Sequence, residues 1–270
     1  MVARILKNLL ALLILIVHIL PFYVLVIISF RAPTDMRPKW IVPSYLYLDN
    51  FINAWNSANL PRALVNDVYI TAFSVILVIL LGSMAGYPLS RYRTRLNTIV
   101  YIVFISCMIV PPLTILVPLY KLVVDIGGMN TYWGIITMQV TFFLPISIFL
   151  FTGFIGTVPK ELDEAAYIDG SGGFGIFFKI VMPLLKPVTA TVAILAGVGI
   201  WNDYQFSLFF LQRTEIQNVP VALGKFFGQF QNQLNWVAAG CLIGSLPMAV
   251  TYLFLQRYFI KGLSAGAVKG

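Results

Sequence analysis

Long runs of apolar residues constrain this chain more than any other feature. A helix needs about 20 consecutive apolar residues to cross the hydrocarbon core of a bilayer, and runs of that length recur along the sequence. In lipid, the backbone polar groups must be satisfied within the chain, so such runs form helices. The sequence therefore predicts an all-α integral membrane protein with six transmembrane helices, at about 9–30, 68–89, 98–119, 132–155, 187–211 and 236–258.

The composition excludes several classes of protein. Of the 270 residues, 59% are hydrophobic and only 10% are charged, whereas a soluble domain has about 25% charged residues. The net charge of +8 reports orientation in a membrane protein and predicts no nucleic-acid partner. Cys107 and Cys241 lie inside apolar runs and are expected to be packing residues rather than a disulfide. No Cys, His and carboxylate cluster has metal-ligand spacing, so no metal site is expected.

The first apolar run is interpreted as an uncleaved span. It extends from Leu9 to Phe30 and lacks an Ala-x-Ala site, whereas a cleaved signal peptide has an apolar region of about 7–15 residues. His18 inside this run is either a proton site or a neutral imidazole bonded to a neighbouring helix. The span contains no acidic partner, which favours the neutral imidazole.

The segment 31–67 is polar and carries scattered aromatic residues, namely Trp40, Tyr45, Tyr47, Phe51 and Trp55. These residues suggest an interfacial aromatic belt or, less favoured, a short amphipathic helix on the membrane. The expected organisation is a first helix with an extracytoplasmic segment (1–65), a membrane core (66–258) containing a polar loop (156–186), and a cytoplasmic tail (259–270).

Two further local patterns predict how the spans are shaped. Gly82–Gly86 and Gly240–Gly244 have GxxxG spacing, which allows close packing of helices but is weak evidence alone. Pro111, Pro112 and Pro118 predict a bent or unwound third span, because proline removes a backbone donor. Such a bend is typical of a cavity lining and equally of a packing kink.

The distribution of basic residues predicts the orientation. With six spans both termini lie on one side, together with the loops 90–97 and 156–186. That side has eleven basic residues, and the other has seven, namely Arg31, Arg37, Lys39, Arg62, Lys121, Arg213 and Lys225. The positive-inside rule therefore predicts cytoplasmic termini in a multi-pass protein of a bacterial or archaeal cytoplasmic membrane.

Sequence signatures of catalysis and of ion coupling are missing from the sequence. It contains no phosphate loop, HExxH or GxSxG motif. Away from the ends of the spans, the ionisable residues are His18 and Asp203, whereas ion-coupled carriers use intramembrane carboxylates or paired charges. We therefore expect a non-enzymatic protein that binds no cofactor itself and takes its energy from a cytoplasmic partner.

The polar loop 156–186 is the candidate contact for that partner. Pro159 suits the first turn of a helix, the acidic residues at 161, 163 and 164 favour its N-terminus, and Gly170 can end it in the left-handed conformation. Ser171 is expected to cap a second short helix. The alternative is a surface loop with an incidental amphipathic helix.

The spacing in this loop resembles the EAA loop of ABC importer permeases. The matching positions are Glu164, Ala165, Ala166, Gly170, Ile180 and Pro183, and the one departure is Met182 in place of leucine. Further matching positions are Asn66, Pro111–Pro112 with Pro118-Leu-Tyr120, Trp201-Asn-Asp203, 256–262 and 266–270. They extend the resemblance to the maltose and multiple-sugar branch, most of all to its smaller permease subunit.

The resemblance implies a type I ABC importer transmembrane domain that forms half of a pathway for a sugar or oligosaccharide. It implies as partners a second homologous permease, an ABC ATPase dimer holding ATP and Mg, an extracytoplasmic sugar-binding protein facing 212–235, and the lipid bilayer. Glu164 would bond to the ATPase groove, Ala165 and Ala166 would pack closely there, and Gly170 would allow the turn. Ile180 and Pro183 complete the matched coupling positions.

The substrate contacts are less clearly indicated. The candidates are Trp201, Asn202, Asp203, Tyr204 and Gln205. Their aromatic and polar side chains suit stacking and hydrogen bonding with a sugar, and they are equally suited to holding the fifth span against its neighbours. The same architecture importing another solute, such as a glycerol phosphate or a peptide, remains an alternative. A stand-alone carrier, channel or membrane enzyme is a further one.

Overall fold

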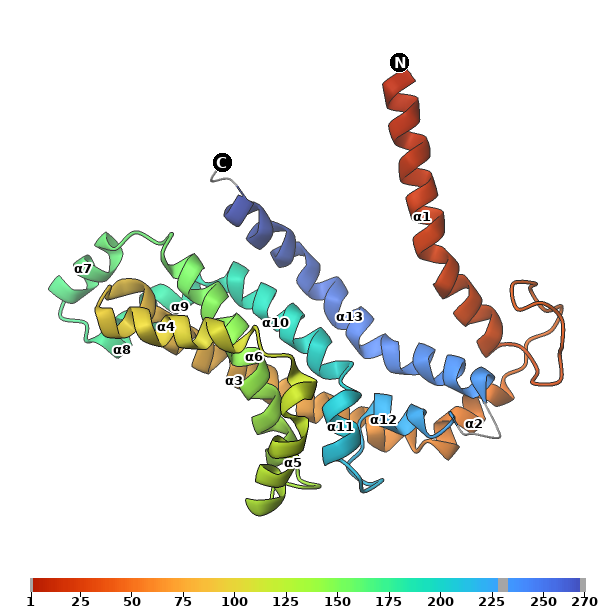
Figure 1. Cartoon of the computed structure of the whole chain (residues 1–270). Helices are drawn as coiled ribbons and strands as arrows, with labels where there is room; N and C mark the ends of the chain where they lie inside the picture. The colour runs from red at the N-terminus through yellow and green to blue at the C-terminus, as the bar shows by residue number, and fades with distance from the viewer. Residues whose placement is uncertain (1, 228–232, 268–270) are drawn as a thin grey trace. The chain divides into compact units, whose positions relative to one another are not determined.

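The computed structural model consists of helices joined by loops (Figure 1). It describes residues 2–227 and 233–267, with the side chains of residues 4–227, 233–254 and 256. The helices are α1 (Val2–Ser29), α2 (Asp49–Ser57), α3 (Leu60–Arg91), α4 (Arg95–Cys107), the 3-10 helix η1 (Pro112–Ile115), α5 (Leu116–Asp125), α6 (Tyr132–Ile155), α7 (Glu161–Ile168), α8 (Gly173–Gly175), the π-helix η2 (Ile176–Val181), α9 (Met182–Leu184), α10 (Lys186–Trp201), α11 (Gln205–Phe210), α12 (Val219–Gly224) and α13 (Leu234–Ala267).

Four helices, α1, α3, α6 and α13, are each long and apolar enough to cross a membrane. Two pairs of segments pass the same test together, with a sharp bend between them. Helix α4 meets η1–α5 at 93°, and α8–α9 meets α10 at 77°. If each bent pair is one span, the described residues contain six, which agrees with the predicted all-α membrane fold.

Closely spaced prolines lie at both bends. The first bend follows the end of α4 at Cys107 and precedes Pro112, and the second lies between Pro183 and Pro187. Isolated prolines are instead accommodated within continuous helices, at Pro21, Pro88, Pro145 and Pro247. Each proline removes one backbone donor and restricts the residue before it. The predicted break in the third span is therefore present.

The chain divides into two compact units. One contains Met1–Val65 and Asn218–Pro247, and the other contains Asn66–Gln217 and Met248–Gly270. Helices α3 and α13 each contribute to both units. Each unit has its own cluster of buried hydrophobic side chains.

In the first unit, the loop after α1 is folded around Arg31, which is 3% exposed. Its guanidinium donates hydrogen bonds to the carbonyls of Arg37 and Pro38, at 2.7 and 3.0 Å, and to the carbonyl of Ile41. Asn50 and Asn235 donate to carbonyls near the end of α1, including that of Arg31 at 2.7 Å from each. These bonds satisfy carbonyls that a helix end leaves without partners.

The surface of this loop combines charged and aromatic groups. Asp35 accepts hydrogen bonds from Arg37 and Tyr45, and its interaction with the Arg37 guanidinium holds the pKa of the carboxyl well below its usual range. Trp40 is 67% exposed in the loop, while Trp55 lies on α2, which buries Asn50 and Ala54. The segment therefore contains both exposed aromatics and one short helix.

Both GxxxG sequences lie at close helix contacts within their own units. A Cβ at Gly86 of α3 would be 2.9 Å from the Phe151 Cβ and 3.1 Å from the Thr152 nitrogen of α6, and one at Gly82 would overlap the Ser147 hydroxyl. In the first unit, a Cβ at Gly244 would be 2.7 Å from the Val219 Cγ1 of α12. Close packing at these glycines is confirmed.

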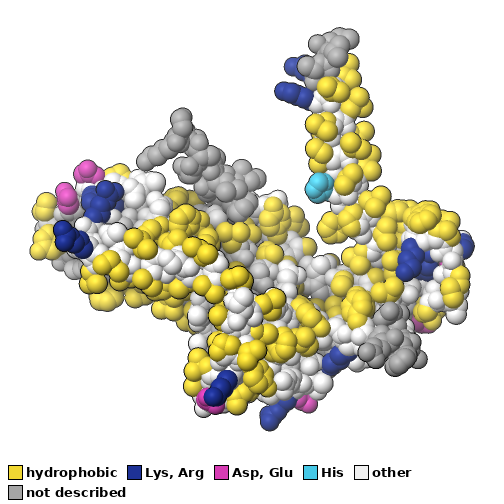
Figure 2. All heavy atoms as spheres, viewed as in Figure 1, with side chains coloured by type: hydrophobic (Ala, Val, Ile, Leu, Met, Phe, Trp, Pro, Cys, Tyr) yellow, Lys and Arg dark blue, Asp and Glu magenta, His cyan; other side chains and the backbone are white. Residues whose placement is uncertain are grey.

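Helix α1 presents hydrophobic side chains along almost its whole length (Figure 2), and residues 4–23 are all exposed. Such a surface requires lipid or another protein as its environment. The Nδ1 atom of His18 lies 2.7 Å from the Ile14 oxygen. This contact lies within α1, and the expected bond of the imidazole to a neighbouring helix stays a prediction. Cys107 and Cys241 are free thiols, the first exposed and the second half-buried.

Candidate functional site

Helix α7, the core of the polar loop, begins and ends through local interactions. The Lys160 carbonyl accepts the first helical bonds, so Pro159 precedes the cap and does not lie in the first turn as predicted. At the other end, Gly170 has φ +82°. The Gly170 N–H donates to the Tyr167 carbonyl at 3.0 Å, and the Ser171 N–H donates to the Ala166 carbonyl at 2.9 Å. These two bonds form the Schellman motif that ends a helix at glycine.

The structure separates the two alanines of the predicted docking face. Ala165 and Glu164 are exposed, whereas Ala166 is 7% exposed and belongs to the core of its own unit. Large apolar side chains flank the exposed positions, with Tyr167 74% and Ile168 83% exposed. The free surface of α7 is therefore more apolar and aromatic than the alanine pair suggested.

The second half of the loop differs in detail from its expected form. Ser171 does not cap a second helix, because its N–H closes α7 and Gly172 occupies the cap position of α8 without a side-chain bond. The π-helix η2 follows and buries Phe177 in the same core. Of the matched coupling positions here, Ile180 is half-buried against that core and Pro183 is exposed.

A cluster around Arg91 fixes the polar loop to α3, and we call it the Arg91 clamp. The Arg91 guanidinium contacts the Asp163 carboxylate of α7 at 2.8 Å and donates to the carbonyls of Ile155 and Val158 at 3.1 and 2.9 Å. The Tyr87 hydroxyl donates to the same carboxylate at 2.9 Å. The Arg91 side chain is 5% exposed and that of Asp163 is 15% exposed.

In the sequence, Arg91 indicates only the orientation of the chain, and Asp163 only a favourable charge at a helix N-terminus. Seventy-two positions separate them in the sequence, so no local pattern pairs them. A weak signal was available, since Arg91 ends one apolar run and Asp163 begins a helix in a loop predicted on the same side of the membrane. Tyr87, one helical turn before Arg91, gave no signal of its own.

The predicted substrate residues follow one another but have different environments. Trp201 is 5% exposed at the end of α10. Asp203 accepts bonds from the Phe206 and Ser207 nitrogens at 3.1 and 3.0 Å, which caps α11, and from the Gln139 amide at 2.8 Å. These contacts give Asp203 a structural task between α6, α10 and α11.

All of the predicted substrate residues except Trp201 retain some exposed surface. Tyr204 is 44% exposed, and Asn202 is exposed although its amide donates to the Val198 carbonyl at 2.8 Å. The Gln205 Nε2 atom is buried and has no hydrogen-bond partner among the described residues. Polar groups for a ligand are therefore present at this break, although they do not form a closed site.

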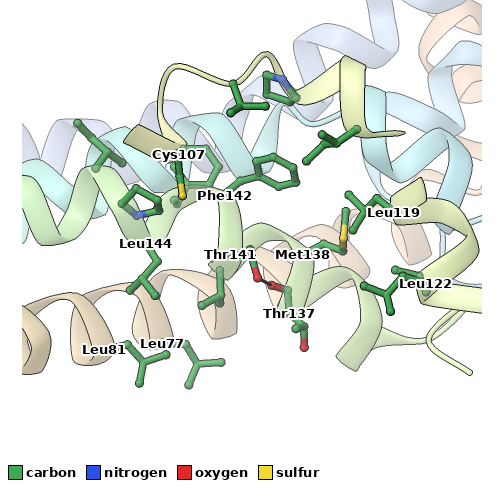
Figure 3. Close-up of a pocket in the computed structure, with 18 of the residues that line it drawn as sticks. Leu77, Leu81, Cys107, Leu119, Leu122, Thr137, Met138, Thr141, Phe142 and Leu144 are labelled. Atoms are coloured by element: carbon green, nitrogen blue, oxygen red, sulfur yellow. Dashed lines mark hydrogen bonds between the residues drawn. The ribbon is translucent and has the colours of Figure 1, made fainter. Parts of the chain in front are cut away.

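A large cavity in the second unit is lined by none of the predicted site residues (Figure 3). It has a volume of about 1040 Å³ between α3, α4, α5 and α6. Its walls are mostly apolar, with Leu77, Leu81, Cys107, Leu119 and Phe142 among them, and Thr137 and Thr141 add hydroxyls. A sugar site needs more polar groups than this, because each sugar hydroxyl taken from water needs a new hydrogen-bond partner.

Among the described residues there is no group of three or more His, Cys, Asp or Glu side chains that could hold a metal ion. The polar loop instead contains a helix with exposed Tyr167 and Ile168 and an inward carboxylate, Asp163, that pairs with the buried Arg91 of α3. This arrangement suits contact with another protein.

Comparison with known proteins gives a consistent result. Residues 78–265 match the family described as the binding-protein-dependent transport system inner membrane component. The melibiose/raffinose/stachyose import permease protein MelC of Bacillus subtilis is 50% identical over 264 residues, covering 97% of this chain and 96% of that protein.

Two further relatives and one solved structure extend the comparison. The maltodextrin permease MdxG of Bacillus subtilis is 35% identical, covering 82% of this chain and 83% of its own. The probable starch degradation products permease AmyC of Thermoanaerobacterium thermosulfurigenes is 33% identical, covering 92% and 91%. A chain of a bacterial ABC transporter that imports alginate has the same fold, with a TM-score of 0.82, 20% identity and 96% of both chains covered.

Proposed function

The chain belongs to the binding-protein-dependent transport system inner membrane component family, the permeases of ABC importers, and from this membership we propose that it forms half of the pathway for a sugar or oligosaccharide. The observation that carries the proposal is the 50% identity to MelC across almost the whole of both chains. MdxG and AmyC are also named for the transport of sugars, which favours carbohydrate over a glycerol phosphate or a peptide.

Raffinose and melibiose are the substrates to test first. They come from the name of MelC, which shares half of its residues with this chain. Relatives named for maltodextrin and starch products are less similar, at 35% and 33% identity. We therefore propose an α-galactoside oligosaccharide as the substrate class.

The energy for transport comes from a partner ATPase that holds ATP and Mg. Helix α7 is its docking element, with Glu164, Ala165, Tyr167 and Ile168 on the exposed face. Ala166 has a different role from the one expected, because a small buried side chain seats α7 closely on its own core. Gly170 ends the helix, and the half-buried Ile180 and exposed Pro183 complete the coupling segment.

The remaining partners follow from the proposed orientation. The polar loop and both termini lie in the cytoplasm, and the loop 212–235 faces an extracytoplasmic sugar-binding protein. A second, homologous permease completes the pathway. The exposed apolar surface of α1 is available to that permease and to lipid.

The substrate path is proposed to pass the break between α10 and α11. Tyr204 and Asn202 offer a ring face and an amide, and Gln205 offers an amide nitrogen without a partner. Trp201 and Asp203 hold this break in shape instead of touching sugar. The partner permease contributes the rest of the sugar site.

Reconstitution tests the proposal. The chain, together with the second permease and the ATPase subunits of its transporter, is placed in liposomes that enclose ATP, and the binding protein and labelled raffinose are added outside. We expect raffinose uptake that requires ATP and every subunit, and none from this chain alone. Uptake by the chain alone would indicate a stand-alone carrier, and uptake of glycerol 3-phosphate or a peptide in place of raffinose would contradict the sugar assignment.

A further inference from the structure

Helix α3 is held at both ends by polar contacts to the two loops that are proposed to meet other proteins. At one end the Arg91 clamp binds α7. At the other end, a second cluster lies at Asn66, and we call it the Asn66 clamp. Both clamps lie within the unit Asn66–Gln217. Because both clamps lie on one helix, the helix connects the two loops that they hold.

The Asn66 clamp uses both donors and the oxygen of one buried amide. The Asn66 amide nitrogen donates to the Glu215 and Gln217 carbonyls at 3.0 and 2.9 Å, and its oxygen accepts from the Tyr132 hydroxyl at 2.7 Å. Asn66 is 3% exposed. The Tyr69 ring lies 4.9 Å from the Tyr132 ring, centre to centre. The loop 212–217 is thus fixed to the first turns of α6 and to α3.

The Arg91 clamp is equally well satisfied. A buried arginine is costly unless its charge is paired and its donors are bonded, and here Arg91 has the Asp163 carboxylate and two backbone carbonyls. The Tyr87 ring also lies 5.4 Å from the Phe177 ring of η2. Both halves of the polar loop therefore contact the last turns of α3.

The helix between the clamps is continuous and tightly supported. Arg91 lies twenty-five positions after Asn66, which corresponds to about 37 Å at about 1.5 Å per helical residue. The Ser147 hydroxyl of α6 donates to the Val78 carbonyl at 3.0 Å, and the glycines at 82 and 86 bring the two backbones close together. A close-packed pair of helices moves as one piece, because packed interiors deform little.

We propose that α3 is the mechanical link between the loop 212–217, which faces the binding protein, and α7, which docks on the ATPase, with Asn66 and Arg91 as its positioning residues. The inference rests on the proposed function, because that function supplies the partners at the two ends. Delivery of sugar outside would move the Asn66 clamp, and the rigid pair α3–α6 would carry this movement to α7. Closure of the ATPases would act in the reverse direction, since coupling between two sites is reciprocal.

The test uses the complete transporter in liposomes with its binding protein and raffinose. The variants are Arg91→Gln, Asn66→Ala and both together, and the matched controls are Arg93→Gln and Val68→Ala, whose side chains are exposed. The readout is the stimulation of ATP hydrolysis by binding protein with raffinose, relative to the basal rate. Copurification of the ATPase reports assembly. If the clamp residues served only to stabilise the structure, their substitution would reduce assembly before it reduced stimulation.

We expect each clamp variant to keep assembly and basal hydrolysis but to lose stimulation by roughly fivefold or more, the lower range of coupling between distinct sites. Stimulation in the double variant is expected to be no lower than in the more impaired single variant, because both changes interrupt one link. Independent sites this far apart would instead combine multiplicatively. Stimulation as in the wild type, or multiplicative losses, would overturn the link.

If Arg91→Gln prevents assembly, Tyr87→Phe decides the question. This substitution removes one hydrogen bond to Asp163 and keeps the ring. Stimulation of hydrolysis should therefore fall by roughly two- to tenfold while assembly stays intact. An unchanged ratio of stimulated to basal hydrolysis overturns the link. A wild-type complex without raffinose-dependent hydrolysis would overturn the proposed function and the link together. If raffinose stimulates hydrolysis by the wild-type complex and stimulates the clamp variants equally well, only the link is overturned.

Discussion

At the scale of single residues, the first turn of α7 shows how neighbouring carboxylates acquire different tasks. Asp163 points into the protein and is bound by Arg91 and Tyr87, whereas Glu164 is exposed. Both favour the positive end of the helix dipole. Only the contact across the unit distinguishes the residue that holds α7 from the one that is free to meet a partner.

Gly170 provides a residue-scale prediction. Its φ of +82° costs a residue with a side chain about 1–2 kcal/mol, although a Cβ there would contact nothing within 4 Å. We expect Gly170→Val to loosen the end of α7 and to reduce raffinose uptake by the reconstituted complex several-fold. Gly170→Asn should lose less, because asparagine tolerates this conformation.

Gly172→Ala is the matched control for Gly170. Gly172 lies in the same loop, also has open space around it, and has φ −74°. Uptake should be unchanged in this variant. Equal uptake by Gly170→Val and Gly172→Ala would show that the left-handed turn is not needed for coupling.

At the scale of elements, proline spacing and glycine spacing shape the spans in opposite ways. Closely spaced prolines lie at the two bends, whereas Gly82 and Gly86 let α3 approach α6 closely because they have no side chains at the contact. The bend after α4 opens an apolar cavity of about 1040 Å³ (Figure 3). The close contact between α3 and α6 provides the stiffness on which the proposed link depends.

Gly86 gives the prediction for this contact. A Cβ there would press on the Phe151 Cβ and the Thr152 backbone nitrogen, so Gly86→Ala should lose about 1–3 kcal/mol through overpacking. Thermal unfolding of the purified protein in detergent measures the loss. Gly153→Ala in α6 is the control, since a Cβ there has nothing within 4 Å, and the higher helix propensity of alanine should leave stability equal or up to about 1 kcal/mol higher. Equal melting temperatures would contradict close packing.

At the scale of the whole molecule, the membrane topology depends on the two bent pairs. Each bent pair either crosses the membrane or turns back within it, and the chain has six spans only if both cross. The interpretation of α7 as cytoplasmic and 212–217 as extracytoplasmic depends on this parity, because α10 with α8–α9 lies between them.

Single cysteines test the topology. Cys107 and Cys241 are first replaced by serine, and cysteine is then placed at Phe174, which is 76% exposed, or at the exposed Thr214. A membrane-impermeant maleimide added to intact cells should label Phe174→Cys weakly and Thr214→Cys strongly, with the order reversed in inside-out vesicles. Labelling of both positions from one side would mean that the second bent pair turns back within the membrane.

The sequence by itself determined the class of fold, the approximate positions of the four long spans and the end of α7. These features are local, since they depend on the length of an apolar run, on proline, and on a glycine that can take a positive φ. The family resemblance also followed from spacing along the chain, and the comparisons confirm it.

Only the tertiary structure decided which side chains face inward. It buried Ala166, gave Asp203 a capping role, and paired Arg91 with Asp163 and Asn66 with the loop 212–217. The last two pairings join residues 72 or more positions apart. No periodicity within one helix reports such contacts, because they depend on how α3, α6 and the loops pack together. The proposed link along α3 therefore appears only once those contacts are in place.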